Sequence, residues 1–140
     1  METDFQAWAR LLRAQRILLE RVETALKEAG LPPLSWYDVL LELSRNDHDG
    51  LRQYEIAERI LLSKHNLTRL LDRLEARGLV VRGACPEDAR GNIVSITAKG
   101  RSLQKRMWPV YADAVKTHFS GRLTAKDLDS LSRILGKVSS

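Results

Sequence analysis

Apolar residues recur at helical spacing along most of the chain, and the first such segment spans residues 5–29. Its apolar residues fall into two heptad columns, and further leucines widen the stripe. Gly30 and the proline pair at 32–33 end the segment, because glycine suits a left-handed cap and proline cannot continue the hydrogen-bond ladder. The pattern predicts one long N-terminal helix with a broad apolar face.

A second helix is expected next, with Ser35 as its N-cap. One of its faces is apolar and consists of Trp36, Val39, Leu40 and Leu43. Residues 46–50 have the composition of a turn, so they are predicted to end this helix.

Two short helices joined by a tight turn are predicted after residue 50. The first covers residues 53–61 and carries at helical spacing Tyr54, Ile56, Ala57 and Ile60. Shortly afterwards, Ser63 is a good N-cap for a second helix that Gly78 ends. The apolar stripe of this second helix has i, i+3, i+4, i+7 spacing and comprises Leu67, Leu70, Leu71 and Leu74. This arrangement is typical of a helix-turn-helix.

The pattern changes after Gly78 to two β-rich runs, residues 79–81 and 93–96. Residues 86–92 separate the runs, have turn composition and include the cation Arg90. The segment is therefore predicted to be a β-hairpin whose tip forms a wing.

Two further helices are predicted in the C-terminal part. Thr97 is the expected cap of a helix over residues 103–119, and Pro109 inside that helix is expected to kink it. A last helix begins at the Thr124 cap with Asp127 three residues on, and its apolar residues have coiled-coil spacing. They are Leu128, Leu131, Leu135 and Val138. The expected fold class is mainly α with a small β-hairpin.

Composition excludes several classes of protein. The chain has 140 residues, enough for one domain with a core, and no apolar stretch near the ~18 residues that a membrane span needs. Its acidic first residues do not match the basic start of a secretory signal, so a cytoplasmic protein is expected. Cys85 is the single cysteine, which excludes an intramolecular disulfide and a cysteine-based zinc site. We expect no cofactor and no metal.

The net charge of +5 is concentrated in the middle of the chain. Residues 1–50 carry 6 Lys and Arg against 9 Asp and Glu, whereas residues 51–106 carry 12 against 6. Because neutralised phosphates release counterions, this local excess of positive charge favours binding to a nucleic acid. The alternative is an ordinary solvated basic face.

The order of predicted elements resembles that of the MarR family of bacterial transcriptional regulators. The resemblance covers nearly the whole chain, and its most specific parts are residues 61–80, 88–90 and 96–100. The family typically carries an Asp-Arg-Arg triplet in the wing. Here Asp88 and Arg90 match the triplet, while Ala89 replaces the middle arginine.

The resemblance implies one domain over residues 1–140, with a winged helix-turn-helix lobe at 35–98. Residues 1–30 and 100–140 would supply helices that pair with their copies in a homodimer. Members of the family bind pseudo-palindromic sites in double-stranded DNA, usually as repressors. Many also have a pocket between the dimer helices and each lobe for a small aromatic or phenolic ligand.

The polar side of the helix expected after Ser63 carries the proposed DNA contacts. They are Ser63, Lys64, His65, Asn66, Thr68, Arg69 and Arg73. The guanidinium of Arg69 is suited to fork onto guanine, and the methyl group of Thr68 to meet a thymine methyl group. His65 and Asn66 are suited to hydrogen bonds with base edges.

Phosphates are the expected partners of Ser63, Lys64 and Arg73, assisted by the positive end of the helix dipole at Ser63. The alternative for the arginines of this helix is an ion pair with one of its own carboxylates, Asp72 or Glu75. At the wing, Arg90 is placed to enter the minor groove. Asp88 either holds that arginine by a salt bridge or is a plain turn aspartate.

Two terminal apolar stripes, in residues 5–29 and 128–138, are more than one small lobe can cover. Packing each against its copy in a second subunit would bury both and space two recognition helices about one DNA turn apart. The alternative is an intramolecular bundle in a monomer. Five aromatic residues fall on helices around the pocket that the resemblance implies: Trp8, Trp36, Tyr37, Trp108 and Tyr111. They either stack on a ligand or belong to the core.

Catalysis is not expected, because the histidines are scattered and neither a phosphate-binding loop nor a nucleophile motif occurs. Cys85 is interpreted as a small hairpin residue, the alternative being a redox sensor beside Arg82. The competing function from another class is a winged-helix protein-interaction module that never binds DNA. Basic residues on the polar face at 63–77 argue against it, because interface cores are depleted of charge.

Overall fold

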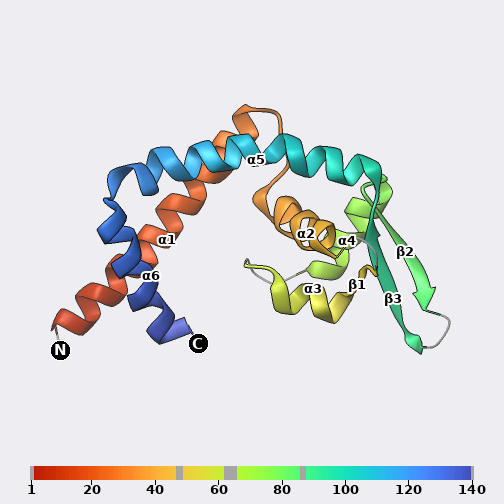
Figure 1. Ribbon diagram of the computed structural model, residues 1–140, viewed down its shortest axis with the longest axis horizontal. Helices are drawn as coiled ribbons and strands as arrows, with labels where there is room; N and C mark the ends of the chain where they lie inside the picture. Colours follow the sequence, from red (N-terminus) through yellow and green to blue (C-terminus); the bar gives the residue numbers. More distant parts are fainter. Residues whose placement is uncertain (1, 47–48, 62–65, 86–87, 140) are drawn as a thin grey trace. The chain divides into compact units, whose positions relative to one another are not determined.

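The computed structural model describes residues 2–46, 49–61, 66–85 and 88–139, with the backbone alone at 84, 85 and 88–92. Figure 1 shows its elements, which in chain order are α1 (Glu2–Glu28), α2 (Leu34–Arg45), β1 (Leu51–Arg52), α3 (Gln53–Arg59), α4 (Leu67–Ala76), β2 (Val80–Cys85), β3 (Asp88–Ile96), α5 (Ala98–His118), the 3-10 turn η1 (Ser120–Arg122) and α6 (Ala125–Ser139). The expected mainly α fold class is confirmed. Within these described residues, no helix is both long and apolar enough to cross a bilayer.

The chain divides into two compact units. The terminal unit combines Met1–Gly30 with Pro109–Ser140, and the lobe is Leu31–Trp108. The boundary falls at Pro109, which lies inside α5 as expected, so α5 contributes to both units. The lobe is therefore longer at both ends than the segment 35–98 expected from the sequence.

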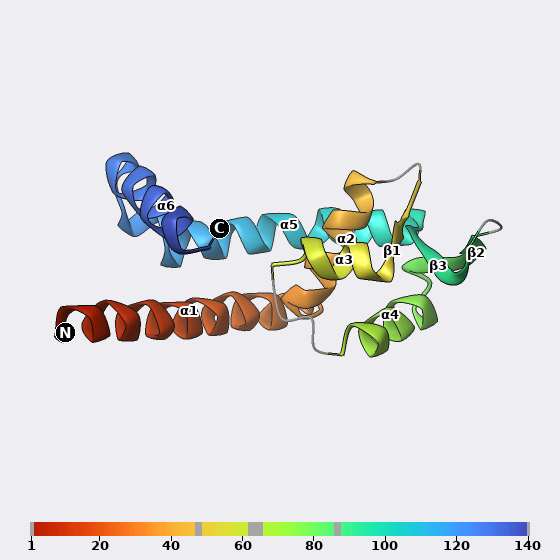
Figure 2. The same ribbon diagram turned by 90° about the horizontal axis from the view of Figure 1, so that it is seen from below.

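The lobe contains an antiparallel sheet with the strand order β1-β3-β2. β2 and β3 make the predicted hairpin, with Val80 opposite Ile96. Its predicted turn at 86–92 is wrong for residues 88–92, because the backbone pairing of the two strands continues past the short apolar runs and includes these residues in β3. β1 was not predicted, because a two-residue strand carries no alternating pattern; it places Leu51 opposite Val94. α4 lies against β2 (Figure 2), so the sheet supports the second helix of the helix-turn-helix.

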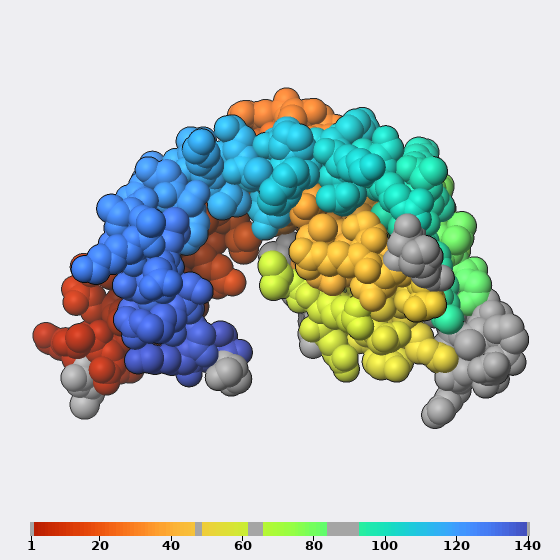
Figure 3. Space-filling view, in the orientation of Figure 1, coloured from red at the N-terminus to blue at the C-terminus, as the bar shows by residue number. Residues whose placement is uncertain are grey.

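One apolar core fills the lobe between its helices and the sheet. Fully buried side chains come from every helix of the lobe and from both long strands: Val39, Leu40, Leu43, Ile56, Leu71, Leu74, Val80, Val94 and Met107. α2 and α3 pack together and adjoin on one face of the lobe (Figure 3). Most of the apolar faces predicted for α2 and α4 is therefore buried, while Trp36 and Leu70 are half-buried.

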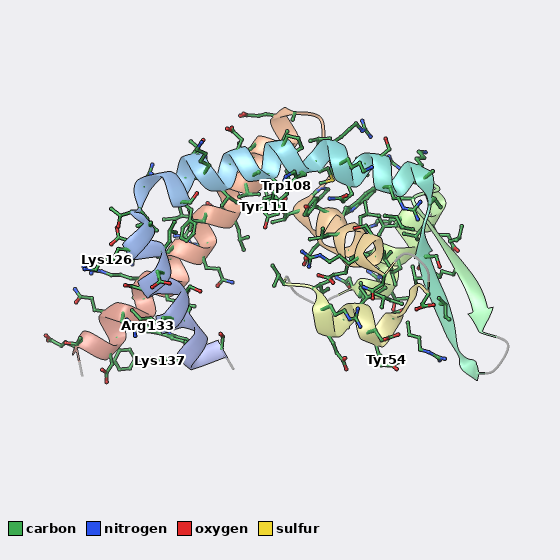
Figure 4. The ribbon with its side chains drawn as sticks, viewed as in Figure 1. Tyr54, Trp108, Tyr111, Lys126, Arg133 and Lys137 are labelled. Carbon is green, nitrogen blue, oxygen red and sulfur yellow. The ribbon has the colours of Figure 1, made fainter. Side chains whose placement is uncertain are left out.

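Tyr54 does not belong to this core, although the sequence placed it on the apolar face of α3. Its side chain is 62% exposed and projects from the helix (Figure 4). The prediction is wrong because α3 has only seven residues and buries Ile56 alone, so its buried face is narrow.

Several predicted helix ends are confirmed. Gly30 and Gly78 adopt left-handed conformations, with φ of 72° and 73°, after α1 and α4. At the start of α6, the N–H of Asp127 donates to Oγ1 of Thr124, and the N–H of Thr124 donates to Oδ2 of Asp127, both at 3.0 Å. This reciprocal pair is a capping box, as the three-residue spacing predicted.

Two helix starts differ from the expectation. α2 begins at Leu34 after Pro33, so Ser35 lies within its first turn and is not its N-cap. The fixed backbone of proline is compatible with a helix start without a capping side chain. α5 begins at Ala98 and not at 103, because Thr97 caps it there and accepts a backbone N–H through Oγ1 at 3.0 Å.

A buried carboxylate ties α2 to the helix-turn-helix. Asp38 is 6% exposed, and its Oδ2 accepts the N–H of Leu61 at 2.8 Å. Leu61 lies in the turn after α3, so this bond fixes the start of the connection to α4. The sequence analysis did not identify Asp38; an acidic residue inside the apolar pattern of a helix was the available clue.

We expect Asp38→Leu to lower the free energy of unfolding by about 1–3 kcal/mol, because leucine is similar in size but offers no acceptor to the Leu61 N–H. Asp38→Asn keeps an oxygen and should cost less. Urea denaturation at one fixed protein concentration measures both variants, with the exposed Asp113→Asn as the control. An Asp38→Leu protein as stable as the control would contradict the role of this bond.

Candidate nucleic-acid interface

The second helix of the helix-turn-helix starts later than the sequence indicated. α4 begins at Leu67, and Asn66 before it is left-handed, with φ of 62°. A left-handed residue cannot continue a right-handed helix, and asparagine tolerates this conformation better than most residues. The prediction of a helix running on from Ser63 is therefore wrong, and the positive end of the helix dipole lies at Leu67. Residues 63–65, which include Lys64 and His65, lie outside the described residues.

α4 has one buried and one exposed side. Leu67, Leu71 and Leu74 are buried in the lobe, and Leu70 is half-buried. On the other side, four polar residues are exposed: Thr68, Arg69, Asp72 and Arg73. The sequence placed them on the DNA-facing side of this helix, and the structure brings them together on its exposed surface.

The carboxylates of α4 pair with an arginine from the sheet. Nη2 of Arg82, on β2, lies 2.5 Å from Oδ1 of Asp72, and its Nε lies 3.8 Å from Oε1 of Glu75. Among the described residues, neither Arg69 nor Arg73 makes an ion pair. The structure therefore contradicts the alternative in which Arg69 and Arg73 pair with carboxylates of their own helix.

Gln53 connects the two helices of the helix-turn-helix. It is the first residue of α3, and its Nε2 donates to Oγ1 of Thr68 at 2.7 Å. The hydroxyl oxygen of Thr68 thereby accepts a hydrogen bond within the protein, which orients this side chain. Sequence reasoning missed Gln53, because its partner lies fifteen residues away and on another helix.

The C-terminal end of α4 is held by polar contacts from two directions. Oγ1 of Thr97 donates to the carbonyl of Gly78 at 2.7 Å, and Nζ of Lys99 donates to the carbonyl of Arg77 at 2.8 Å. The guanidinium of Arg77 also lies over the ring of Trp36, 5.8 Å from its centroid. The last turn of the helix is thus fixed to α2 and to the start of α5.

For the wing residues 84, 85 and 88–92, the structure describes the backbone alone. Asp88 and Arg90 belong to β3, and Cys85 ends β2 opposite Asp88. The side chains of these three residues lie outside the described part of the chain. The roles predicted for Arg90 and Asp88 therefore stay predictions.

The five aromatic residues assigned to a ligand pocket are divided between the units. Trp36, Tyr37 and Trp108 belong to the lobe, and Trp8 and Tyr111 to the terminal unit. Tyr37 is buried, its ring stacks on Trp108 at a centroid distance of 6.2 Å, and its hydroxyl accepts a hydrogen bond from Gln104. Tyr37 is thus part of the lobe core.

Comparison with known proteins identifies relatives along the whole chain. The sequence profile of the MarR family matches residues 29–91. The transcriptional regulator HosA of Escherichia coli O111:H- is 30% identical over 115 residues, which are 82% of this chain and 84% of that protein.

Two solved structures from Streptomyces coelicolor also align with this chain. Sco3205, a MarR family regulator crystallised in complex with DNA, has a TM-score of 0.90 and 27% identity over 99% of this chain and 87% of its own. AbsC, another MarR family regulator, has a TM-score of 0.87 and 29% identity over 99% of this chain and 93% of its own. The profile match, the level of identity and the shared fold agree with the helix-turn-helix and wing described above. The chain belongs to the MarR family of transcriptional regulators.

Proposed function

We propose that this protein is a homodimeric repressor that binds a pseudo-palindromic DNA site and inserts α4 into the major groove. The observation that carries the proposal is the exposed side of α4, where Arg69 and Arg73 make no ion pair among the described residues while Arg82 holds both neighbouring carboxylates. Two cations without protein partners on one helix face suit an anionic ligand. The relative Sco3205 was solved with DNA, which supports this choice. A DNA partner implies a cytoplasmic site of action.

The individual contacts follow from the position of each residue on α4. Arg69 lies in the first turn of the helix, where side chains reach base edges, and its guanidinium can fork onto guanine. Arg73, one turn further along, is assigned to a phosphate. Asn66 precedes the helix and Thr68 presents its methyl group, and both are assigned to base edges.

Four residues outside the described side chains complete the proposed interface. Ser63, Lys64 and His65 precede Asn66 in the chain, and Arg90 belongs to the wing strand β3. Lysine and arginine at these positions would add phosphate or minor-groove contacts. Asp88 is assigned to support of the wing arginine.

The terminal unit supports the proposal of a homodimer. α1 has 27 residues but buries only Val22 and Leu26, near its end, while Phe5 and Trp8 are 67% and 58% exposed. α6 buries no residue, and its apolar positions repeat along one side. Its basic residues Lys126, Arg133 and Lys137 follow another side (Figure 4). Exposed apolar faces that run along a whole helix are usually covered by a partner. A second copy of the chain would cover the faces of α1 and α6 with two-fold symmetry.

A protein-interaction module without DNA binding is the competing proposal. It would require the exposed side of α4 to enter a protein interface, where unpaired charges are costly. The basic character of that side and the DNA complex of a relative both favour DNA. We propose no catalytic role.

Control by a small aromatic or phenolic ligand is part of the proposal. Its support is the exposed ring of Trp108, which stacks on Tyr37, and the contact of Trp36 with Arg77 at the end of α4. A compound that bound a DNA-incompetent arrangement of the lobes more tightly than the DNA-competent one would weaken DNA binding.

DNA selection tests the central proposal. The purified wild-type protein, incubated with random-sequence duplexes, should recover a two-fold symmetric motif. Arg69→Ala should bind the recovered duplex about 1–3 kcal/mol more weakly, roughly 5- to 150-fold, because it loses the fork onto guanine. Fluorescence anisotropy at fixed salt concentration measures the affinity.

The matched control is Arg133→Ala, which removes the same charge from an exposed position of α6. It should leave the affinity unchanged. If the wild type recovers no motif, or if the two alanine variants lose affinity equally, sequence recognition by α4 is refuted.

The dimer is tested by placing a charge on the exposed apolar face of α1. Trp8→Glu should raise the dimer dissociation constant roughly 100-fold or more, because it buries an unpaired carboxylate in the proposed interface. Sedimentation equilibrium measures the change. Gln6→Glu, on the far side of the same helix, introduces the same charge and should leave the dimer intact; equal behaviour of the two variants would argue against this interface.

A further inference from the structure

Arg82, on β2, is a largely buried arginine that faces two carboxylates of α4. Its side chain is 16% exposed, whereas the two carboxylates that it faces, Asp72 and Glu75, are 60% and 46% exposed. The Nε atom of Arg82 is buried and makes no hydrogen bond within the described residues. The guanidinium is therefore largely withdrawn from solvent, and the two acidic side chains of α4 lie against it.

We propose that Arg82 is a positioning residue for DNA binding, which keeps the carboxylates of α4 away from the arginines of the same helix. Asp72 comes three residues after Arg69, and residues at this spacing are neighbours on a helix surface. Without Arg82, Asp72 is free to pair with Arg69. The proposal rests on the proposed function, because it concerns the same face of α4.

The charges of α4 explain why an arginine that binds its carboxylates would favour DNA binding. The helix presents Arg69 and Arg73 among two carboxylates, and an acidic side chain near DNA repels the phosphates. Arg82 compensates part of this negative charge from the side of the sheet. It therefore affects DNA binding without touching DNA, by leaving the guanidinium groups of α4 free for the nucleic acid.

Arg82 could instead have a purely structural role, as a link between β2 and α4. The two roles predict different effects on DNA affinity when the carboxylates are removed. If the ion pairs of Arg82 only hold β2 against α4, removing the two carboxylates abolishes these ion pairs and should weaken DNA binding. If Arg82 withdraws the carboxylates from the arginines, their removal should do no harm. The variants Asp72→Asn and Glu75→Gln remove the charges while keeping the size of both side chains.

The test uses the duplex that the wild type recovers by selection, with affinity followed by fluorescence anisotropy. Arg82→Met, similar in length but uncharged, should bind about tenfold more weakly, since the loss acts at both half-sites of a dimer. Adding Asp72→Asn and Glu75→Gln to Arg82→Met should restore the affinity to within about threefold of the wild type. Asp72→Asn with Glu75→Gln alone should bind at least as tightly as the wild type.

Each other result overturns the inference. If Arg82→Met binds DNA with wild-type affinity, Arg82 has no role in DNA binding. If the two carboxylate substitutions do not restore the affinity of Arg82→Met, the role of Arg82 is structural. If Arg82→Met does not fold, as judged by circular dichroism, the double carboxylate variant decides alone, and weaker binding by it refutes the proposal. A wild type that binds no duplex would instead refute the proposed function itself.

Discussion

The burial of one side of α4 is the constraint on which the interface depends. A helix of ten residues is marginal in water by itself, so its conformation depends on packing against the lobe. Leu67, Leu71 and Leu74 supply that packing, and each fully buried leucine contributes about 1.5–3 kcal/mol relative to exposure. Because these three residues determine which side faces the core, they also determine that Arg69 and Arg73 face outward.

Packing fixes the face of α4, and polar contacts fix its position. Gln53 holds Thr68 near its start, Arg82 holds the carboxylates at its middle, and Lys99 holds the carbonyl of Arg77 at its end. Each contact joins α4 to a different element, respectively α3, β2 and α5. Directional bonds of this kind specify an orientation that apolar packing leaves adjustable.

Periodic features of the fold were predictable from sequence, whereas contacts between distant residues were not. The leucine stripe of α4, the glycine at 78 and the capping box at Thr124 each follow from local spacing. The start of α4 was misplaced because serine at 63 is a favourable N-cap residue, while the left-handed backbone of Asn66, after which α4 begins, leaves no mark on the local apolar spacing. The partner of Asp38 lies 23 residues away, which no local pattern reveals.

The same limit applies to the candidate site. Sequence reasoning identified the polar residues of α4 from their spacing, but the only partners that it considered for Asp72, as an alternative to DNA contacts, were arginines of the same helix. The actual partner, Arg82, belongs to a strand and lies ten residues from Asp72. Strand pairing brings Arg82 opposite Val94, and the contact of β2 with α4 then brings it to the carboxylates.

The exposed apolar faces of the terminal unit imply that its folding depends on the proposed dimerisation. A 15-residue helix that buries nothing, such as α6, gains too little from its own hydrogen bonds to offset the entropy of ordering it. In the proposed dimer, covering α1 and α6 would supply the missing apolar burial in both copies at once. The stability of the terminal unit would then depend on protein concentration, because association contributes to the folded state by mass action. DNA binding by two lobes requires the same association, so one interface would control both the order of the terminal helices and the affinity for a two-fold symmetric site.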